Sequence, residues 1–337
     1  MGLSAGVSVK ISIMYRLFLF LLGIAGFVAG PMANAQSVIG KMDYFGQRPP
    51  GDAAVLFANG VVSDAMANRD FTISPAGDEI FYTVQQRDFL SSTIIRIKKS
   101  NGKWGQPEVA PFSGRYNDLE ATFTADGKKL FFSSNRPVKE GEQKEDFDIW
   151  FTQLENGRWS KPVHLDSPVN SAKDEFYPSV TKNGNIYFTS QLESGKGKED
   201  IVVCEWKDGK YSAPKSLPEA INTAGYEFNA FVDPDEQFVI FTGYARKDGM
   251  GSGDLYIARR DAQGNWLQAV NMGAKVNSPN LDYCPFVSWD KKYLFFTSNK
   301  TSFKTPFTKV VSYTDLKKAL MSAENGFDNI YWINFAP

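Results

Sequence analysis

A short pattern recurs five times along this chain of 337 residues, and it constrains the fold more than any other feature. Each copy consists of the end of one strand, a tight polar turn and a second strand rich in aromatic residues. Asp-Gly and Asn-Gly at such turns indicate tight hairpins, because Gly tolerates positive φ. Self-similarity of this kind predicts a repeat architecture. The copies are ISPAGDEIFYT from Ile73, FTADGKKLFFSS from Phe123, VTKNGNIYFTS from Val180, VDPDEQFVIFTG from Val232 and VSWDKKYLFFTS from Val287.

A third and a fourth strand are predicted after each copy. A Gly turn follows most of the third strands and leads to a short segment such as NGRWSKPVHL. Further on comes VNS at Val169, INT at Ile221 or VNS at Val276. Four short antiparallel strands in each unit of about fifty residues are typical of a β-propeller blade. The predicted third strands are STIIRIKK from Ser92, FDIWFTQL from Phe147, EDIVVCEW from Glu199, GDLYIARR from Gly253 and DNIYWINF from Asp328.

The fifth unit ends at the C-terminus without a fourth strand, whereas an extra strand-like segment, from Gly51 to Ser63, precedes the first unit. We therefore expect residues 54–57 to pair with residues 331–334. Such pairing would close the ring and remove exposed sheet edges, which are an aggregation hazard. The predicted fold class is all-β: a five-bladed β-propeller of four-stranded antiparallel blades, closed by an N-terminal strand that completes the last blade.

The motifs SPAGDEIFY, TADGKKLFFSSNRP and DFDIW resemble the WD40-like β-propeller repeats of bacterial exported proteins. The Tol-system translocation propeller belongs to the same broad group. The resemblance covers Asp43 to Pro337. It implies a propeller that serves as a scaffold, as a periplasmic binding protein or as a domain attached to an enzyme. The fourth and fifth units lack the turn glycine, and the extra domain of the Tol propeller is not evident in this sequence.

The N-terminal segment has the pattern of a secretory signal peptide. Arg16 precedes the apolar stretch from Leu17 to Val28, and Ala33-Asn34-Ala35 provides a small-x-small cleavage site. The apolar stretch is too short for a comfortable membrane span. We therefore expect residues 1–35 to be removed, residues 36–337 to form a single β-propeller domain, and the mature chain to be periplasmic or secreted without a membrane span.

Charge and cysteine content exclude some classes of protein. The formal net charge is −1, so the sequence shows no basic excess that would favour a nucleic-acid partner. The two cysteines, Cys204 and Cys284, are expected in different blades, which favours two buried thiols over a disulfide. With His164 as the single histidine, a Cys/His zinc site is improbable. No cofactor is expected, with calcium as the alternative.

The candidate site lies where five inner strands begin. We use the term long-loop face for the face that carries the connections between second and third strands and between blades, because long loops on a rigid scaffold usually bind partners. Polar residues open each inner strand there. They form either a mouth that binds a cation, a sugar or a peptide terminus, or internal hydrogen bonds and ion pairs. The candidates are Asp118, Glu175, Glu227 and Asp282, together with Arg136 and Lys300.

One connection on this face has helical spacing. In residues 312–326, Leu316, Ala319 and Leu320 share a face, Thr314 provides a cap and Gly326 a stop. Two interpretations remain open: a plug that buries Leu316 and Leu320, or a lid or partner surface.

The function predicted from these features is that of an exported binding or scaffolding propeller, which engages a protein or glycan partner through the long-loop face. The alternative is a carbohydrate-active enzyme of the glycoside hydrolase type, with paired carboxylates at the channel mouth. Similar acids recur in blade after blade, whereas a catalytic acid and base need different surroundings. Catalysis is therefore the less favoured interpretation.

Overall fold

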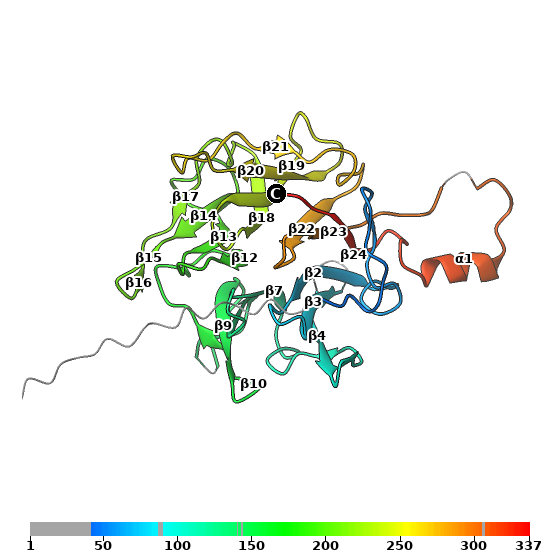
Figure 1. Ribbon diagram of the computed structural model, residues 1–337, viewed down its shortest axis with the longest axis horizontal. Coiled ribbons are helices and arrows are strands. Elements are labelled where there is room, and N and C mark those ends of the chain that lie inside the picture. Colours follow the sequence, from blue (N-terminus) through cyan, green and yellow to red (C-terminus); the bar gives the residue numbers. More distant parts are fainter. Residues whose placement is uncertain (1–41, 87–89, 140, 143, 305–306) are drawn as a thin grey trace, which may run out of the picture. The chain divides into compact units, whose positions relative to one another are not determined.

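The computed structural model describes residues 42–337, except residues 87–89, 140, 143 and 305–306. The predicted signal peptide and the boundary at residue 36 lie outside the described residues. Five antiparallel sheets succeed one another along the chain and form a five-bladed β-propeller (Figure 1). The predicted fold class is therefore confirmed. None of the described helices is long and apolar enough to cross a membrane.

Each blade has three long strands and a very short outer one. The inner strands are β2 (Ala67–Ile73), β7 (Asp118–Phe123), β12 (Glu175–Val180), β18 (Tyr226–Val232) and β22 (Asp282–Val287). The second strands are β3 (Glu79–Gln85), β8 (Lys129–Ser134), β13 (Ile186–Ser190), β19 (Phe238–Tyr244) and β23 (Tyr293–Ser298). The third strands are β4 (Ser92–Ser100), β9 (Asp148–Glu155), β14 (Asp200–Cys204), β20 (Gly253–Arg259) and β24 (Asn329–Asn334).

The outer strands have two residues each: β6 (Glu108–Val109), β11 (Val163–His164), β17 (Lys215–Ser216), β21 (Val270–Asn271) and β1 (Val55–Leu56). Three blades carry a further short hairpin after the third strand: β5 (Lys103–Trp104) pairs with β4, β10 (Arg158–Trp159) pairs with β9, and β15 (Trp206–Lys207) pairs with β16 (Lys210–Tyr211). His164 thus lies in an outer strand, far from the strands that line the channel.

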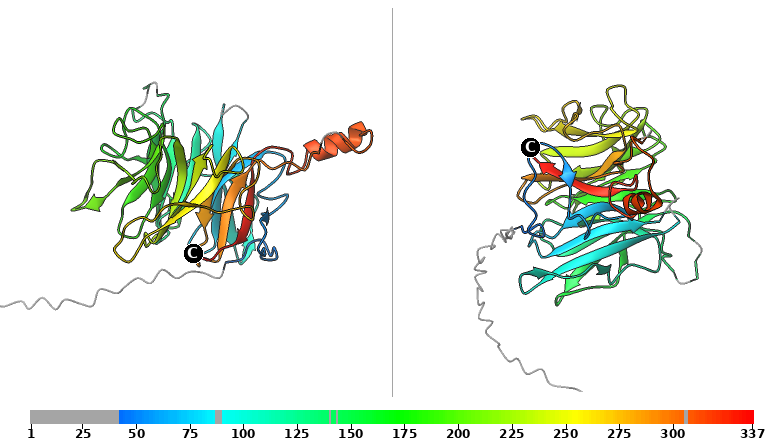
Figure 2. Two further views of the ribbon diagram at one scale, coloured as in Figure 1. Left: turned by 90° about the horizontal axis from the view of Figure 1, so that it is seen from above. Right: turned by 90° about the vertical axis from the view of Figure 1, so that its right-hand side faces the viewer.

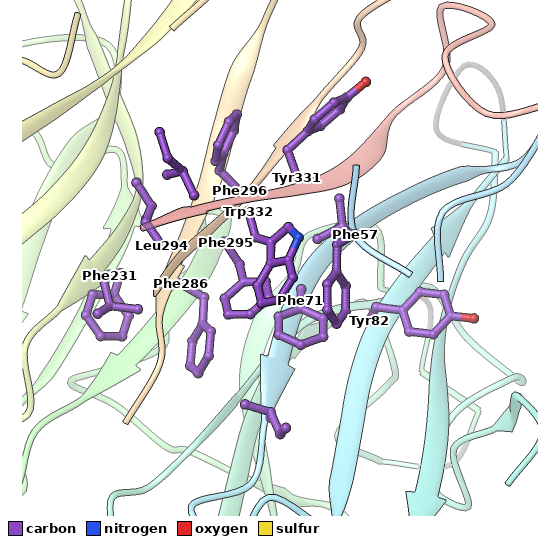
Figure 3. Close-up of a cluster of buried hydrophobic side chains, with 14 of the residues drawn as sticks. Phe57, Phe71, Tyr82, Phe231, Phe286, Leu294, Phe295, Phe296, Tyr331 and Trp332 are labelled. Carbon is purple, nitrogen blue, oxygen red and sulfur yellow. The ribbon is translucent and has the colours of Figure 1, made fainter. Parts of the chain in front are cut away.

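The N-terminal strand β1 completes the last blade, as the sequence predicts. Strand β1 lies beside β24 (Figure 2), and in the antiparallel ladder Val55 pairs with Trp332 and Leu56 with Tyr331. The next residue, Phe57, packs between the last and the first blade, with ring centroids 5.3 Å from Trp332 and 5.0 Å from Phe71 (Figure 3). Buried aromatic side chains therefore pack between the last blade and the first blade, where the propeller closes.

The recurring Asn of the VNS and INT motifs continues the outer edge of the blade. In the third blade, Asn222 accepts a hydrogen bond from Ile201 N at 3.0 Å and donates one to Ile201 O at 2.8 Å. Asn170 makes the same two bonds with Ile149, and Asn277 makes them with Leu255. The side-chain amide therefore acts as one more residue of the outer strand.

The helix in the last long connection differs from the prediction. Helix α1 (Tyr313–Leu320) is capped by Ser312 instead of Thr314, because the Ser312 side chain accepts a hydrogen bond from Asp315 N, and it ends well before Gly326. None of its residues is buried, and the helix projects away from the blades (Figures 1 and 2). The interpretation of this segment as a plug that buries Leu316 and Leu320 is therefore wrong.

Both cysteines are buried free thiols. Cys204 lies in β14 of the third blade and Cys284 in β22 of the fifth. The expectation of two thiols in different blades is confirmed.

Replacement of Asn222 by Ala should destabilise the protein, because the buried Ile201 N–H would lose its partner. An unsatisfied buried backbone group costs about 1–3 kcal/mol. Urea denaturation should show a lower midpoint for Asn222→Ala with an unchanged slope. Gln268→Ala, at an exposed position, serves as the control and should leave the midpoint unchanged. Equal urea midpoints for Asn222→Ala and the unmodified chain would show that the hydrogen bonds between the Asn222 amide and Ile201 do not stabilise the protein.

Candidate ligand-binding site

The four acids predicted at the channel mouth do open inner strands, but all four are buried. Each carboxylate is bonded within its own blade or to the segment that leads into it. Arg136 and Ser134 both donate hydrogen bonds to Oδ1 of Asp118, and Ser113 donates to its Oδ2 at 2.8 Å. Asp118 and Arg136 therefore form a buried ion pair.

In the next three blades, the acid accepts hydrogen bonds from the turn that precedes it in the chain. Glu175 accepts from Ser171 Oγ at 2.6 Å, Glu227 from Thr223 N at 2.7 Å and Asp282 from Ser278 N at 2.6 Å. Each of these donors is the Ser or Thr that ends a VNS or INT motif. The motif and the acid four residues later thus form one recurring turn.

The basic partners of these acids differ between blades. Lys300 Nζ lies 3.9 Å from Asp282, whereas Glu227 pairs at 2.9 Å with Arg246, a residue that the sequence analysis did not single out. Among the described residues, the donors to Glu175 are hydroxyl and backbone groups of Ser171 and Ser190. Burial raises the pKa of Glu175 to about 7, helped by the charge of Asp148 and opposed by the Ser171 hydrogen bonds.

A metal site is not evident at these acids. Over the described ranges, no three side chains of His, Cys, Asp and Glu come together as a ligand set. Calcium binding at the mouth stays a prediction of the sequence.

Every inner strand is interrupted by a β-bulge at the same place. The register between inner and second strands shifts there in all five blades. One non-glycine residue in each bulge has a left-handed backbone, with φ between 49° and 63°. Such conformations cost about 1–3 kcal/mol and cluster at functional sites. The five residues are Asp70, Glu120, Tyr177, Asn229 and Cys284.

The bulge residues differ in chemical type from blade to blade. The position two residues earlier in each inner strand is filled by Asn68 and four similar acids, as a repeated structural role requires. The bulge carries instead two acids, a phenol, an amide and a thiol. Two of these side chains, Glu120 and Asn229, line a cavity.

A cavity of ≈ 700 Å³ lies beside the bulges, at the end of the channel that belongs to the long-loop face. All five blades contribute to its wall. Each supplies the residue immediately before its bulge residue, and side chains from the ends of second strands and from the approach to third strands complete the rim. The residues before the bulges are Arg69, Leu119, Phe176, Phe228 and Tyr283.

Arg69 organises the charged side of the cavity and is itself buried. Its guanidinium donates to Asp70 at 2.7 Å, to Glu120 at 2.8 Å and to Gln85 at 3.4 Å. It also lies 5.0 Å from the ring centroid of Tyr283. A single arginine from the first blade thus connects the first, second and fifth blades.

The Glu120 carboxylate on the cavity wall accepts hydrogen bonds from four residues. Besides Arg69, it accepts from Tyr177 N at 2.7 Å, Asn229 Nδ2 at 3.1 Å and Ser133 Oγ at 3.3 Å. Burial raises the pKa of Glu120 to about 7, although the charge of Arg69 and these hydrogen bonds oppose the shift.

None of the four acids of the sequence prediction lines this cavity, and neither Arg136 nor Lys300 does so. The cavity residues lie one and two positions after those acids, and the prediction missed them. A signal was present, because the aligned triplets NRD, DLE, EFY, EFN and DYC agree closely at the first position and vary at the next two.

Comparisons with known proteins support the fold. No family model matches the sequence, and no curated protein matches it either. Among solved structures, a glycoside hydrolase is 9% identical with a TM-score of 0.51, over 85% of this chain and 92% of that one.

Two further solved structures are more distant likenesses, each with a TM-score of 0.46. An alpha-L-arabinofuranosidase from Lactobacillus brevis is 10% identical over 80% of this chain and 95% of that one. TolB from Acinetobacter baumannii is 14% identical over 79% of this chain, which spans about half of TolB (54%). At 9% identity, the likeness to the glycoside hydrolase shows a shared fold alone. The five sheets of this structure confirm the propeller implied by the WD40-like resemblance, whereas membership of that repeat family stays a prediction.

The stability of the protein should depend on pH through Glu175. Its pKa rises from 4.5 to about 7 on folding, so folding favours the protonated carboxyl. The resulting stabilisation is complete below pH 4.5 and disappears as the pH rises through 7. Relative to the unmodified chain, Glu175→Gln should gain on the order of 3 kcal/mol between pH 4.5 and pH 8. Urea denaturation of both chains at the two pH values measures this gain. A constant difference would contradict the prediction.

Proposed function

We propose that this protein is an exported binding β-propeller, which engages a glycan or protein partner through its long-loop face. One end of that partner enters the cavity formed by all five blades. The observation that carries the proposal is that all five blades contribute to one cavity, each with a residue of its own type placed immediately before a strained bulge residue. A scaffold that needed only repeated supports would not require such variation.

The position of the cavity also supports this function. Rigid inner strands place its deep residues, and the long connections surround its mouth. Sites of this kind, concave and largely apolar with a few convergent polar groups, are typical of ligand binding. Export is proposed from the signal-like segment at residues 1–35, and the partner would then be met in the periplasm or outside the cell.

Removal of one aromatic wall residue should weaken ligand binding without unfolding the protein. Phe176 is half-buried and lines the cavity, so Phe176→Ala should weaken binding of any cavity ligand at least about tenfold. A thermal-shift screen of oligosaccharides and peptides would identify ligands. The control is Tyr244→Ala, which removes a half-exposed aromatic ring outside the cavity. If every ligand bound Phe176→Ala as tightly as the unmodified chain, the binding site would lie outside the cavity and the proposal would be contradicted.

A second function, glycoside hydrolysis, is favoured by one observation at Glu120. This carboxyl lines the cavity, and its pKa of about 7 suits a general acid at neutral pH. Asp328 lines the same cavity and would be the second carboxylate that such hydrolysis needs.

This second function predicts turnover of aryl-glycosides by the purified protein. Glu120→Gln should lower kcat by about 10²-fold or more, and the pH profile of kcat/KM should lose its limb near pH 7. Glu193→Gln, an exposed change outside the cavity, should retain full activity. A complete panel of aryl-glycosides without turnover would exclude hydrolysis and leave the binding function.

A further inference from the structure

The charges on the cavity wall do not balance. Among the described residues that line it, four are acids and Arg69 is the only base. Arg69 is already paired with Asp70 and Glu120. Its single positive charge is therefore shared by two carboxylates before any other acid of the wall is considered.

The other three acids of the wall are Glu145, Glu199 and Asp328. In the part of the chain that the structure describes, none of them forms an ion pair with a Lys, Arg or His side chain. Burial raises the pKa of Glu199, with a further contribution from the charge of Asp174. Burial also raises the pKa of Asp328, against the charge of Arg69 and a hydrogen bond from Tyr283. Apart from the charge of Arg69 near Asp328, the described residues of the wall provide no cation for these carboxylates.

Aromatic rings also line the cavity, among the charged groups. Phe147 and Phe176 lie with ring centroids 5.1 Å apart, and Phe228 and Tyr283 continue the same lining. Ring faces attract ammonium groups by cation–π interaction, and they also cover the apolar C–H faces of sugar rings. Both effects favour a ligand that combines a positive charge with a ring-shaped body.

Three asparagines at the rim supply hydrogen-bond donors. The Oδ1 atoms of Asn117, Asn135 and Asn299 each hold a backbone N–H of the rim at 3.0 Å. Among the described residues, their Nδ2 groups have no partner. Amide N–H groups of this kind suit the hydroxyl oxygens of a polyhydroxylated ligand.

From these contacts we infer that the cavity binds a glycan end that carries free amino groups. Ammonium groups pair with Glu199 or with Asp328, the sugar ring packs against Phe176 and the neighbouring rings, and hydroxyl groups accept from the rim asparagines. This inference rests on the proposed function and names the ligand chemistry of the same cavity.

The test compares two sugars that differ in charge through acetylation of their amino groups. Isothermal titration calorimetry of the protein with a glucosamine trimer should give at least about tenfold tighter binding than with the N-acetylglucosamine trimer, because acetylation removes the positive charges. Glu199→Gln should weaken glucosamine-trimer binding about tenfold and leave the acetylated trimer unaffected. The matched control is Glu193→Gln, which removes one charge from the same loop at an exposed position outside the cavity.

Equal or tighter binding of the acetylated trimer would overturn the inference, as would equal losses in the Glu199→Gln and Glu193→Gln variants. Binding of spermidine or lysine peptides without binding of the glucosamine trimer would overturn the assignment to a sugar. Neutral ligands that depend on Phe176 would defeat the inference but leave the proposed function intact. If no ligand depends on Phe176, both fail.

Discussion

The structure depends on a polar side chain next to each short outer strand, which hydrogen-bonds the backbone of the third strand where the outer strand has ended. The outer strands form only two ladder pairs, and the backbone N–H of the next residue adds a third contact to the third strand, as Leu217 N does to Ile201 O at 3.0 Å. The amide of Asn222 then completes the pairing of Ile201. In the last blade Ser63 takes this place and bonds Ile330 through its hydroxyl. Buried backbone groups are thereby satisfied without a long fourth strand.

The turn that carries the outer-edge asparagine also anchors the start of the next inner strand. The same turn that carries Asn222 also carries Thr223, whose N–H and hydroxyl bond Glu227 at the start of the inner strand. Each inner strand is therefore anchored at the long-loop face, two residues before its bulge. Strained bulges persist where the surroundings over-determine them. The anchored strands can thus hold Asn229 and its counterparts in left-handed conformations beside the cavity.

Much of the fold could be predicted from the sequence, because blade formation depends on local patterns. Turn glycines, alternating aromatic strands and their repetition indicate each hairpin, and the missing fourth strand of the last unit indicates closure by residues 54–57. The helix boundaries were predicted less well, since Ser312 and Thr314 are both competent caps. The candidate cavity was not predicted in its residues. The predicted acids open the inner strands next to it, but the repeated similarity of residues such as Asp118 and Glu175 reflects buried turns that recur in each blade.

The sequence by itself determined the blades, their number and the segment that closes the ring, because those features follow from hydrophobic alternation and turn chemistry over a few residues. Only the tertiary structure decided which side chains form the site. A bulge places Glu120 and Asn229 in left-handed conformations, and no local pattern reports it. Their contact, at 3.1 Å across 109 residues of chain, exists because closure of the ring brings the inner strands of different blades around one channel.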